Sequence, residues 1–321
     1  MTVAAPTLAD IRAAAGRIAH QVRRTPLVNV HPTRHRGTVG QLLLKLECLQ
    51  VTGTFKARGA LNKLASLTEA DRRRGLITAS GGNHGIAVAH AGWLAGVPAT
   101  IYLPSSTPPA KREKIRHWGG RIEIHGDVWD DANAAAVARA EKDGLTYVHP
   151  FADPLVIAGQ GTIGLELHAD EPELDTLLVA IGGGGLISGV AIAAKALNPN
   201  LRIVGVEPTG APTLLESVRA GHPVRLSHVD TMAGTLAPRE SAEINLGIID
   251  RLVDDIVLVS DDDMREAARW LWTELGIAAE LSGAATVAAL LNGQVASVPT
   301  ETVCALVCGT GTDGVIAEAG P

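Results

Sequence analysis

The chain has 321 residues, of which 46% are hydrophobic and only 3% are aromatic, and its formal net charge is −6. This length can form two lobes or one large α/β domain, packed mainly by aliphatic side chains. The acidic balance provides no basic surface for nucleic acid, and no apolar run is long enough to span a bilayer, so we expect neither nucleic acid nor membrane as a partner.

The N-terminus shows no secretory pattern of charged and then apolar residues. Instead, Thr7 followed by Asp10 predicts the capped start of a surface helix. The three cysteines, Cys48, Cys304 and Cys308, include no Cys-x-x-Cys pair and support neither a disulfide framework nor a zinc site. We therefore expect a cytoplasmic protein.

Strand-like apolar runs alternate with helical segments rich in Ala and Leu along most of the chain. This alternation is typical of parallel sheets built from βαβ units. No low-complexity linker interrupts it, so a second lobe is expected to be inserted within the first. The clearest predicted strands are 42–46, 99–103, 121–124, 176–181, 202–206, 256–259 and 302–307, and the predicted helices include 132–142, 189–197, 264–275 and 283–291.

Lys56 lies in the segment Thr-Gly-Thr-Phe-Lys-Ala-Arg-Gly-Ala, between a strand-like run and a helix-compatible stretch. This places it in the first turn of a helix near the end of a strand, where open α/β sheets bind their ligands. The helix dipole and Arg58 both disfavour its ammonium form, and a neutral amine can form a Schiff base with a carbonyl. Taken alone, the pattern more often marks a solvated lysine.

A run of four glycines, Gly182 to Gly185, follows one predicted strand and precedes a helix. Backbone N–H groups in such a turn can close around an anion, with the helix dipole adding to the attraction. The Gly-Lys-Ser/Thr ending of a P-loop is absent, and the spacing matches the dinucleotide fingerprint poorly. The run therefore predicts a site for a monophosphate group, with a tight turn as the alternative.

A second glycine-containing segment, residues 78–85, reads Thr-Ala-Ser-Gly-Gly-Asn-His-Gly and also precedes a helix. Ser80 offers a hydroxyl, Asn83 an amide, and the helix start favours a carboxylate. Alone it could be a capped loop. The last predicted strand ends in Cys308-Gly-Thr-Gly, which adds a small polar side chain and flexible turns.

Together these segments, Thr-Phe-Lys56-Ala-Arg-Gly-Ala, Ala-Ser-Gly-Gly-Asn83-His-Gly, Gly182-Gly-Gly-Gly-Leu and Cys308-Gly-Thr-Gly, resemble the pyridoxal-phosphate enzymes of the tryptophan-synthase-β fold, fold type II. The match is best with the serine/threonine dehydratase and serine racemase branch. The resemblance implies a two-lobed α/β fold of parallel-rich twisted sheets flanked by helices. It places a small domain, residues 52–151, within a large cofactor-binding domain, residues 1–51 and 152–321, and it implies a homodimer.

The resemblance also implies roles for individual residues. Lys56 would hold pyridoxal 5'-phosphate as a Schiff base and then remove the α-proton of the substrate. Phe55 would flank the cofactor ring, Asn83 would bind its hydroxyl, and Cys308 would face its pyridine nitrogen as a neutral thiol. The phosphate would be held by Gly182, Gly183, Gly184, Gly185 and Leu186, and the substrate carboxylate by Ser80, Gly81, Asn83 and His84. The implied reaction converts L-threonine or L-serine to 2-oxobutanoate or pyruvate and ammonia.

Two departures from the branch's pattern qualify this reading. Racemases carry a serine at the position of Gly81, which acts as acid/base on the opposite face, so racemisation is disfavoured here. Glu207 and Ala211 match a divalent-cation site for Mg or Ca, but Thr213 replaces its acidic ligand. The alternatives are a dehydratase for another β-hydroxy amino acid, such as 3-hydroxyaspartate or a 3-aryl-serine, a serine racemase, and a non-enzymatic binder of phosphate ligands.

Overall fold

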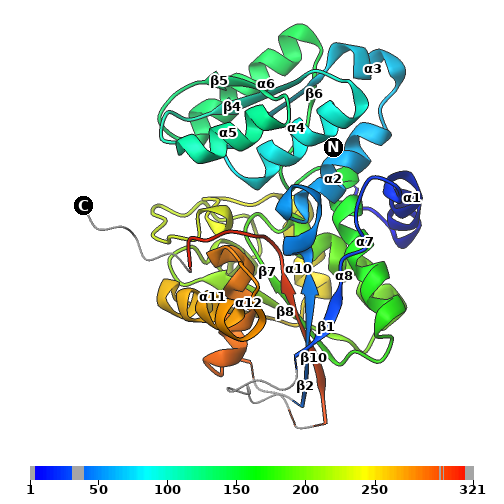
Figure 1. Cartoon of the computed structure of the whole chain (residues 1–321), viewed down its shortest axis with the longest axis vertical. Helices are drawn as coiled ribbons and strands as arrows, with labels where there is room; N and C mark the ends of the chain where they lie inside the picture. Colours follow the sequence, from blue (N-terminus) through cyan, green and yellow to red (C-terminus); the bar gives the residue numbers. More distant parts are fainter. Residues whose placement is uncertain (1–3, 31–39, 296–297, 299, 315–321) are drawn as a thin grey trace.

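The computed structural model describes residues 4–30, 40–295, 298 and 300–314, and these residues form two β-sheets surrounded by helices (Figure 1). The larger sheet has six strands in the order β1-β2-β10-β7-β8-β9, and only the pair β1 and β2 is antiparallel. Its strands are β1 (Leu27–Asn29), β2 (Gln41–Leu46), β7 (Thr176–Ala180), β8 (Arg202–Pro208), β9 (Asp255–Val259) and β10 (Thr302–Val307).

The smaller sheet has four parallel strands in the order β5-β4-β3-β6. Its strands are β3 (Leu76–Ala79), β4 (Ala99–Leu103), β5 (Arg121–Ile124) and β6 (Thr146–Tyr147). The chain enters this sheet after β2 and leaves it before β7, so its strands are inserted between strands of the larger sheet. Parallel strands need crossover connections, and the helices of these connections cover the sheet faces.

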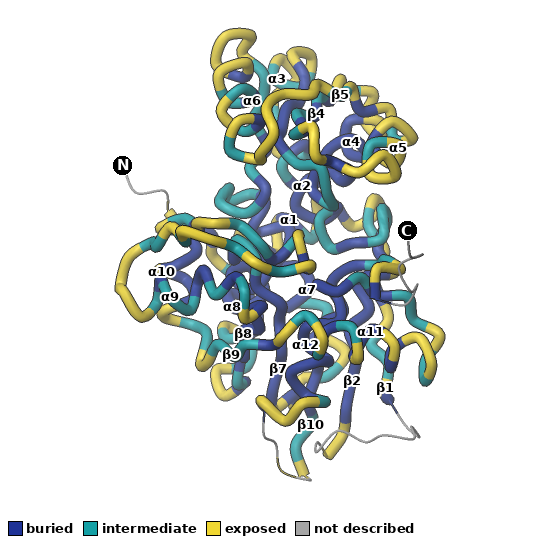
Figure 2. Tube along the Cα trace, turned by 90° about the vertical axis from the view of Figure 1, so that its left-hand side faces the viewer, coloured by how far each residue is buried: buried dark blue, intermediate teal, exposed yellow. Residues whose placement is uncertain are grey.

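Twelve helices occupy the described residues: α1 (Leu8–Ile18), α2 (Lys56–Ala65), α3 (Glu69–Arg74), α4 (Asn83–Ala95), α5 (Pro109–His117), α6 (Trp129–Asp143), α7 (Pro154–Asp170), α8 (Gly185–Leu197), α9 (Thr213–Ala220), α10 (Glu243–Leu252), α11 (Asp261–Leu275) and α12 (Leu281–Leu291). Figure 2 shows the buried interior passing through the larger sheet and helices α7 and α8. None of the helices is long and apolar enough to cross a membrane.

The central strands of the larger sheet are buried on both faces, as their aliphatic runs predict. Every residue of β7 is buried, and so are Val303 to Val307 of β10. Helix α12 packs against β10, β7, β8 and β9, while α8 packs against β7 and is itself covered by α7. This enclosure fixes the carboxyl ends of β7 and β10, from which the glycine run and Cys308 continue.

Helix α2 connects the two halves of the molecule. It packs against α4, which flanks the smaller sheet, and against α7, which lies on the side of the larger sheet (Figure 1). Two short 3-10 turns, Glu47–Leu49 and Val51–Gly53, lead from β2 into its first residue, Lys56. Lys56 therefore lies where the two halves meet.

The predicted helix cap at Thr7 is confirmed. The Thr7 hydroxyl accepts from the Asp10 backbone, and the Asp10 carboxylate accepts in return from Thr7, at the start of α1. Ser260 and Asp263 form the same capping box at the start of α11. Helix α8 begins at Gly185, four residues earlier than the predicted segment 189–197, because the glycine run itself supplies its first turn.

Candidate active site

The first turn of α2 is held against the end of β10. Thr54 forms an isolated β-bridge with Gly309, and the Phe55 backbone N–H donates to the Cys308 carbonyl at 3.3 Å. These contacts bring Phe55 and Lys56 beside Cys308, although the three residues come from opposite ends of the chain. The prediction that Lys56 opens a helix near the ends of the strands is confirmed.

The Lys56 side chain is half-buried, and its amine is positioned by two neighbours. Its Nζ donates to the Pro150 carbonyl at 2.7 Å and lies 5.1 Å from the centre of the Phe55 ring. Burial lowers the pKa of Lys56 from 10.5 to about 8, against the opposing influence of Cys308 and Glu280. The direction of this pKa shift agrees with the sequence prediction, but its cause does not involve Arg58.

Arg58 faces away from the Lys56 amine and belongs to a buried ion cluster, defined as Lys45, Glu47, Arg58 and Glu166. Its guanidinium contacts Glu47 at 2.7 Å and Glu166 at 2.6 Å, and Lys45 also contacts Glu166 at 2.6 Å. The two carboxylates compensate the charge of Arg58. It therefore serves to connect α2 to α7 and β2, rather than to repel a proton from Lys56.

The glycine run forms a cup between β7 and α8. Gly184 has a φ of +86°, which favours glycine, and a Cβ on Gly183 would lie 2.3 Å from the Phe151 ring. The Gly183 carbonyl accepts hydrogen bonds from the Ser241 hydroxyl at 3.0 Å and from the Asn245 amide. These donors anchor the cup, and the first N–H groups of α8 are left without intrahelical acceptors, as at every helix start. The cup is thus suited to an anion.

A cavity of about 40 Å³ brings the predicted cofactor residues together. The lining includes every one of them: Phe55, Lys56, Asn83, Gly182, Gly183, Gly184, Gly185, Leu186 and Cys308. Burial raises the pKa of the Cys308 thiol well above its usual value, and its Sγ donates to the Ser282 carbonyl at 3.4 Å. Cys308 is therefore neutral.

Glu280 also lines this cavity and was not predicted from the sequence. Its Oε1 accepts from the Asn83 amide at 2.7 Å. Burial and the neighbouring Asp313 raise the pKa of Glu280 to about 7. In the sequence Glu280 is only an acidic residue before a helix, and that pattern usually marks a helix start.

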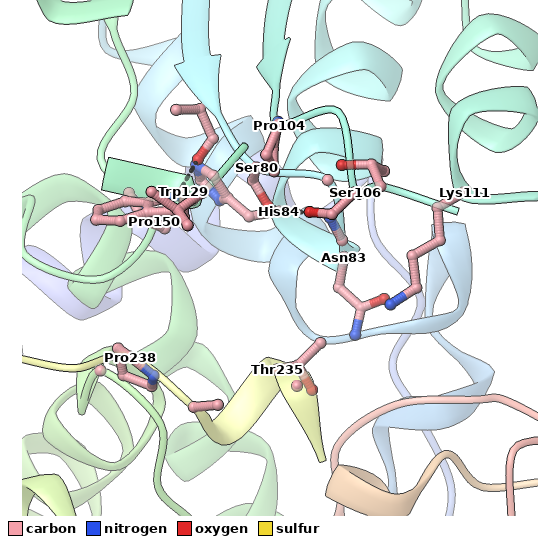
Figure 3. Close-up of a pocket in the computed structure, with 18 of the residues that line it drawn as sticks. Ser80, Asn83, His84, Pro104, Ser106, Lys111, Trp129, Pro150, Thr235 and Pro238 are labelled. Carbon is pink, nitrogen blue, oxygen red and sulfur yellow. Dashed lines mark hydrogen bonds between the residues drawn. The ribbon is translucent and has the colours of Figure 1, made fainter. Parts of the chain in front are cut away.

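A larger cavity of about 550 Å³ adjoins the first and shares Lys56, Asn83 and Gly183 with it. Its lining includes all predicted substrate residues: Ser80, Gly81, Asn83 and His84. Figure 3 shows Ser80, Asn83 and His84 on one side of this cavity and Thr235 and Pro238 on the other. The substrate-facing loop and the glycine cup therefore open into connected space.

His84 is fixed as a neutral ring. Its Nε2 donates to the Val148 carbonyl at 2.9 Å, and its Nδ1 has no hydrogen-bond partner among the described residues. Burial, together with Lys56, lowers the pKa of His84 from 6.5 to about 3. The uncharged ring adds no positive charge at this loop, whereas the start of α4 favours an anion there.

The predicted cation residues do not form a cation site within the described part of the chain. Both Glu207 carboxylate oxygens accept from the start of α9, Oε1 from the Leu214 N–H at 2.8 Å and Oε2 from the Leu215 N–H at 2.9 Å. Thr213 donates its hydroxyl to the Pro238 carbonyl, and Ala211 is buried. No group of three His, Cys, Asp or Glu side chains could hold a metal ion in these residues. Both Glu207 oxygens therefore already accept backbone N–H groups, and position 213 offers no second carboxylate.

Three comparisons place this architecture among known proteins. The family model described as pyridoxal-phosphate dependent enzyme matches residues 18–309. The L-threonine ammonia-lyase of Thermotoga maritima is 41% identical over 286 residues, which cover 89% of this chain and 71% of that protein. The structure of maize serine racemase has a TM-score of 0.89 and 35% identity, covering 96% of this chain and 94% of the other. The processed threonine deaminase isoform 2 of Solanum lycopersicum has a TM-score of 0.88 and 36% identity, covering 95% and 89%.

The fold and the connected cavities define a fold-type II enzyme with a buried lysine. The chain belongs to the pyridoxal-phosphate-dependent enzymes, and both the expected cofactor and the expected α/β fold are confirmed. The described residues fit this cofactor because one cavity combines an amine of lowered pKa, a neutral thiol and the glycine cup. Side chains at the glycine positions would collide with their neighbours, so only glycine leaves the backbone of the cup accessible.

Proposed function

We propose that this protein is a pyridoxal-phosphate-dependent ammonia-lyase, which converts L-threonine or L-serine to 2-oxobutanoate or pyruvate and ammonia. The observation that carries the proposal is the placement of the Lys56 amine, whose pKa is lowered to about 8, between the glycine cup and the loop of Ser80 to His84. Relatives named threonine ammonia-lyase and threonine dehydratase support the choice of L-threonine.

Lys56 has two roles in this proposal. Its neutral amine would hold the cofactor through the aldehyde, and the same Nζ, when free, would accept the α-proton of the substrate as general base. The bound cofactor supplies the electron sink for that proton's bonding pair. The lowered pKa increases the fraction of neutral amine near physiological pH over that of an ordinary lysine, and both roles require the neutral form.

The other residues bind and orient. The amides at the start of α8 hold the cofactor phosphate, while Asn83, itself fixed by Glu280, binds the ring hydroxyl. The neutral Cys308 thiol would lie opposite the pyridine nitrogen without protonating it, which would limit build-up of negative charge on the substrate carbon. The loop of Ser80, Gly81, Asn83 and His84 receives the substrate carboxylate. Loss of the β-hydroxyl and hydrolysis of the released product complete the reaction.

A substrate panel tests this function. The holoenzyme is incubated with L-threonine, L-serine, 3-hydroxyaspartate and 3-phenylserine, and the 2-oxo acid and ammonia are measured. We expect the highest kcat/KM with L-threonine or L-serine and no turnover by Lys56→Ala. Faster turnover of 3-hydroxyaspartate or 3-phenylserine would reassign the substrate, and turnover of none of the four would refute the proposal. Chiral analysis of the remaining serine measures racemisation, which we expect to be slow because Gly81 has no side chain.

We also propose the domain division at residues 52–151, a homodimer and a cytoplasmic location. Strands of the smaller sheet all fall between residues 76 and 147, which supports the division. The three buried free cysteines are consistent with a reducing compartment. Light scattering after size-exclusion chromatography tests the dimer, since a single species with the mass of one chain would contradict it.

A further inference from the structure

Thr107 fills the space beside Gly81 in the substrate-facing cavity. Gly81 lies in the loop between β3 and α4, and Thr107 in the loop between β4 and α5. A Cβ on Gly81 would lie 2.6 Å from Thr107 Oγ1 and 2.8 Å from its Cγ2. The Thr107 side chain thus occupies the volume that any side chain at position 81 would need.

The position of Thr107 is fixed by its own loop. Its backbone N–H donates to the Pro104 carbonyl at 3.1 Å, and its carbonyl accepts from Arg112 Nε at 2.8 Å. Pro104 and Pro108 restrict the backbone on either side. With only 7% of its surface exposed, the side chain has little room to turn away from Gly81.

Thr107 lines the substrate-facing cavity, and its hydroxyl forms no hydrogen bond with another residue in the described part of the chain. It lines the cavity of about 550 Å³ together with Ser80, Gly81 and Asn83. Figure 3 shows the neighbouring positions Pro104 and Ser106 on the same side as Ser80 and Asn83. Nearly buried hydroxyls are almost always hydrogen-bonded, so this one is available to a ligand or to water in the cavity.

We propose that Thr107 is a substrate-binding residue whose hydroxyl donates a hydrogen bond to the substrate carboxylate. This inference rests on the proposed function, in which the loop of Ser80 to His84 receives that carboxylate. Thr107 Oγ1 lies next to Gly81 in that loop, so it adds a side-chain donor where the loop has only backbone. The loop between β4 and α5 thereby contributes a donor to the carboxylate site.

The test compares Thr107→Val, which keeps the shape and removes the hydroxyl, with Thr107→Ser, which keeps the hydroxyl. The matched control is Ser105→Ala, because Ser105 is in the same loop, is exposed and donates to Asp127 at 2.6 Å outside the cavity. We expect Thr107→Val to raise KM for L-threonine and L-serine about 10-fold with little change in kcat, as loss of one hydrogen bond to a charged group predicts. Thr107→Ser and Ser105→Ala are expected to stay within twofold of wild type.

A KM for Thr107→Val within twofold of wild type would overturn the proposal, as would an equal rise for Ser105→Ala. The spectral change on adding L-alanine, which has the carboxylate but no β-hydroxyl, is measured in parallel with each holoprotein. We expect Thr107→Val to weaken the binding of L-alanine about 10-fold as well. An unchanged affinity for L-alanine would overturn the proposed contact with the carboxylate. If wild type bound L-alanine but turned over no β-hydroxy amino acid, the proposed function would fail while this measurement still decided the role of Thr107.

Discussion

Replacement of Arg58 by methionine tests whether the buried ion cluster holds the active-site helix in place. The Arg58 side chain has no exposed surface and lies two residues after Lys56 on α2. Its Nε and Nη2 donate to Glu47 at 2.8 and 2.7 Å, and its Nη1 donates to Glu166 at 2.6 Å. In wild type the two carboxylates are balanced by Arg58 and Lys45, so the variant leaves one negative charge uncompensated.

The size of the effect follows from the burial of Glu47. Its side chain, like that of Arg58, has no exposed surface, so water cannot replace the lost guanidinium. Removal of one partner from a buried ion pair typically costs about 3–5 kcal/mol. We therefore expect the free energy of unfolding to fall by about 4 kcal/mol, which is close to three orders of magnitude in the unfolding equilibrium constant at about 1.4 kcal/mol per tenfold.

Urea unfolding of the apoprotein, followed by tryptophan fluorescence, measures this loss. Arg12→Met is the matched control, because Arg12 is exposed on α1 and should change stability by less than about 0.5 kcal/mol. The double variant Glu47→Gln with Arg58→Met should recover part of the loss, since Lys45 and Glu166 then remain as a neutral pair. A loss below about 1 kcal/mol for Arg58→Met would refute the assigned role of the cluster.

Three further outcomes follow from the site. Because burial lowers the pKa of Lys56 to about 8, its amine is mostly neutral above that pH. The rate of cofactor attachment to the apoprotein should therefore rise with pH around a midpoint near 8. A midpoint at 10.5, the ordinary pKa of a lysine side chain, would contradict this. Asn245→Ala removes a donor to the Gly183 carbonyl and should weaken cofactor affinity about tenfold by equilibrium dialysis, whereas unchanged affinity would argue against the anchoring of the cup. Chelation with EDTA should leave 2-oxo acid production unchanged, because both Glu207 oxygens accept backbone N–H groups; activity lost to EDTA and restored by Mg²⁺ would contradict this.

Features set by local sequence were predicted well. The cap at Thr7, the glycine run before α8 and the place of Lys56 in the first turn of α2 each depend on residues close together in the chain. The segments that resemble a known family then indicated which of these features would meet in one cavity. The sheets followed from aliphatic runs, because a strand buried on both faces needs them.

Features set by distant contacts were missed or misattributed. Glu280 belongs to the site because it accepts a hydrogen bond from Asn83, which lies 197 residues away in the sequence. Asn245 belongs to it because its amide donates to the Gly183 carbonyl. The lowered pKa of Lys56 was assigned to the helix dipole together with Arg58, because the sequence does not show that two distant carboxylates surround that guanidinium. Helix α7 was not predicted: its glycines weaken the helical pattern, yet Gly159 allows close packing, since a Cβ there would lie 2.6 Å from the Arg58 carbonyl.

The most direct test of the central claim is to locate the lysine that carries the cofactor. Holoprotein is reduced with borohydride, digested and mapped by mass spectrometry. We expect the reduced pyridoxyl group on the peptide containing Lys56, and we expect Lys56→Ala to lose both this label and the absorbance of the attached cofactor. A yellow, cofactor-loaded protein with unmodified Lys56, or with the label on the neighbouring Lys63, would contradict it.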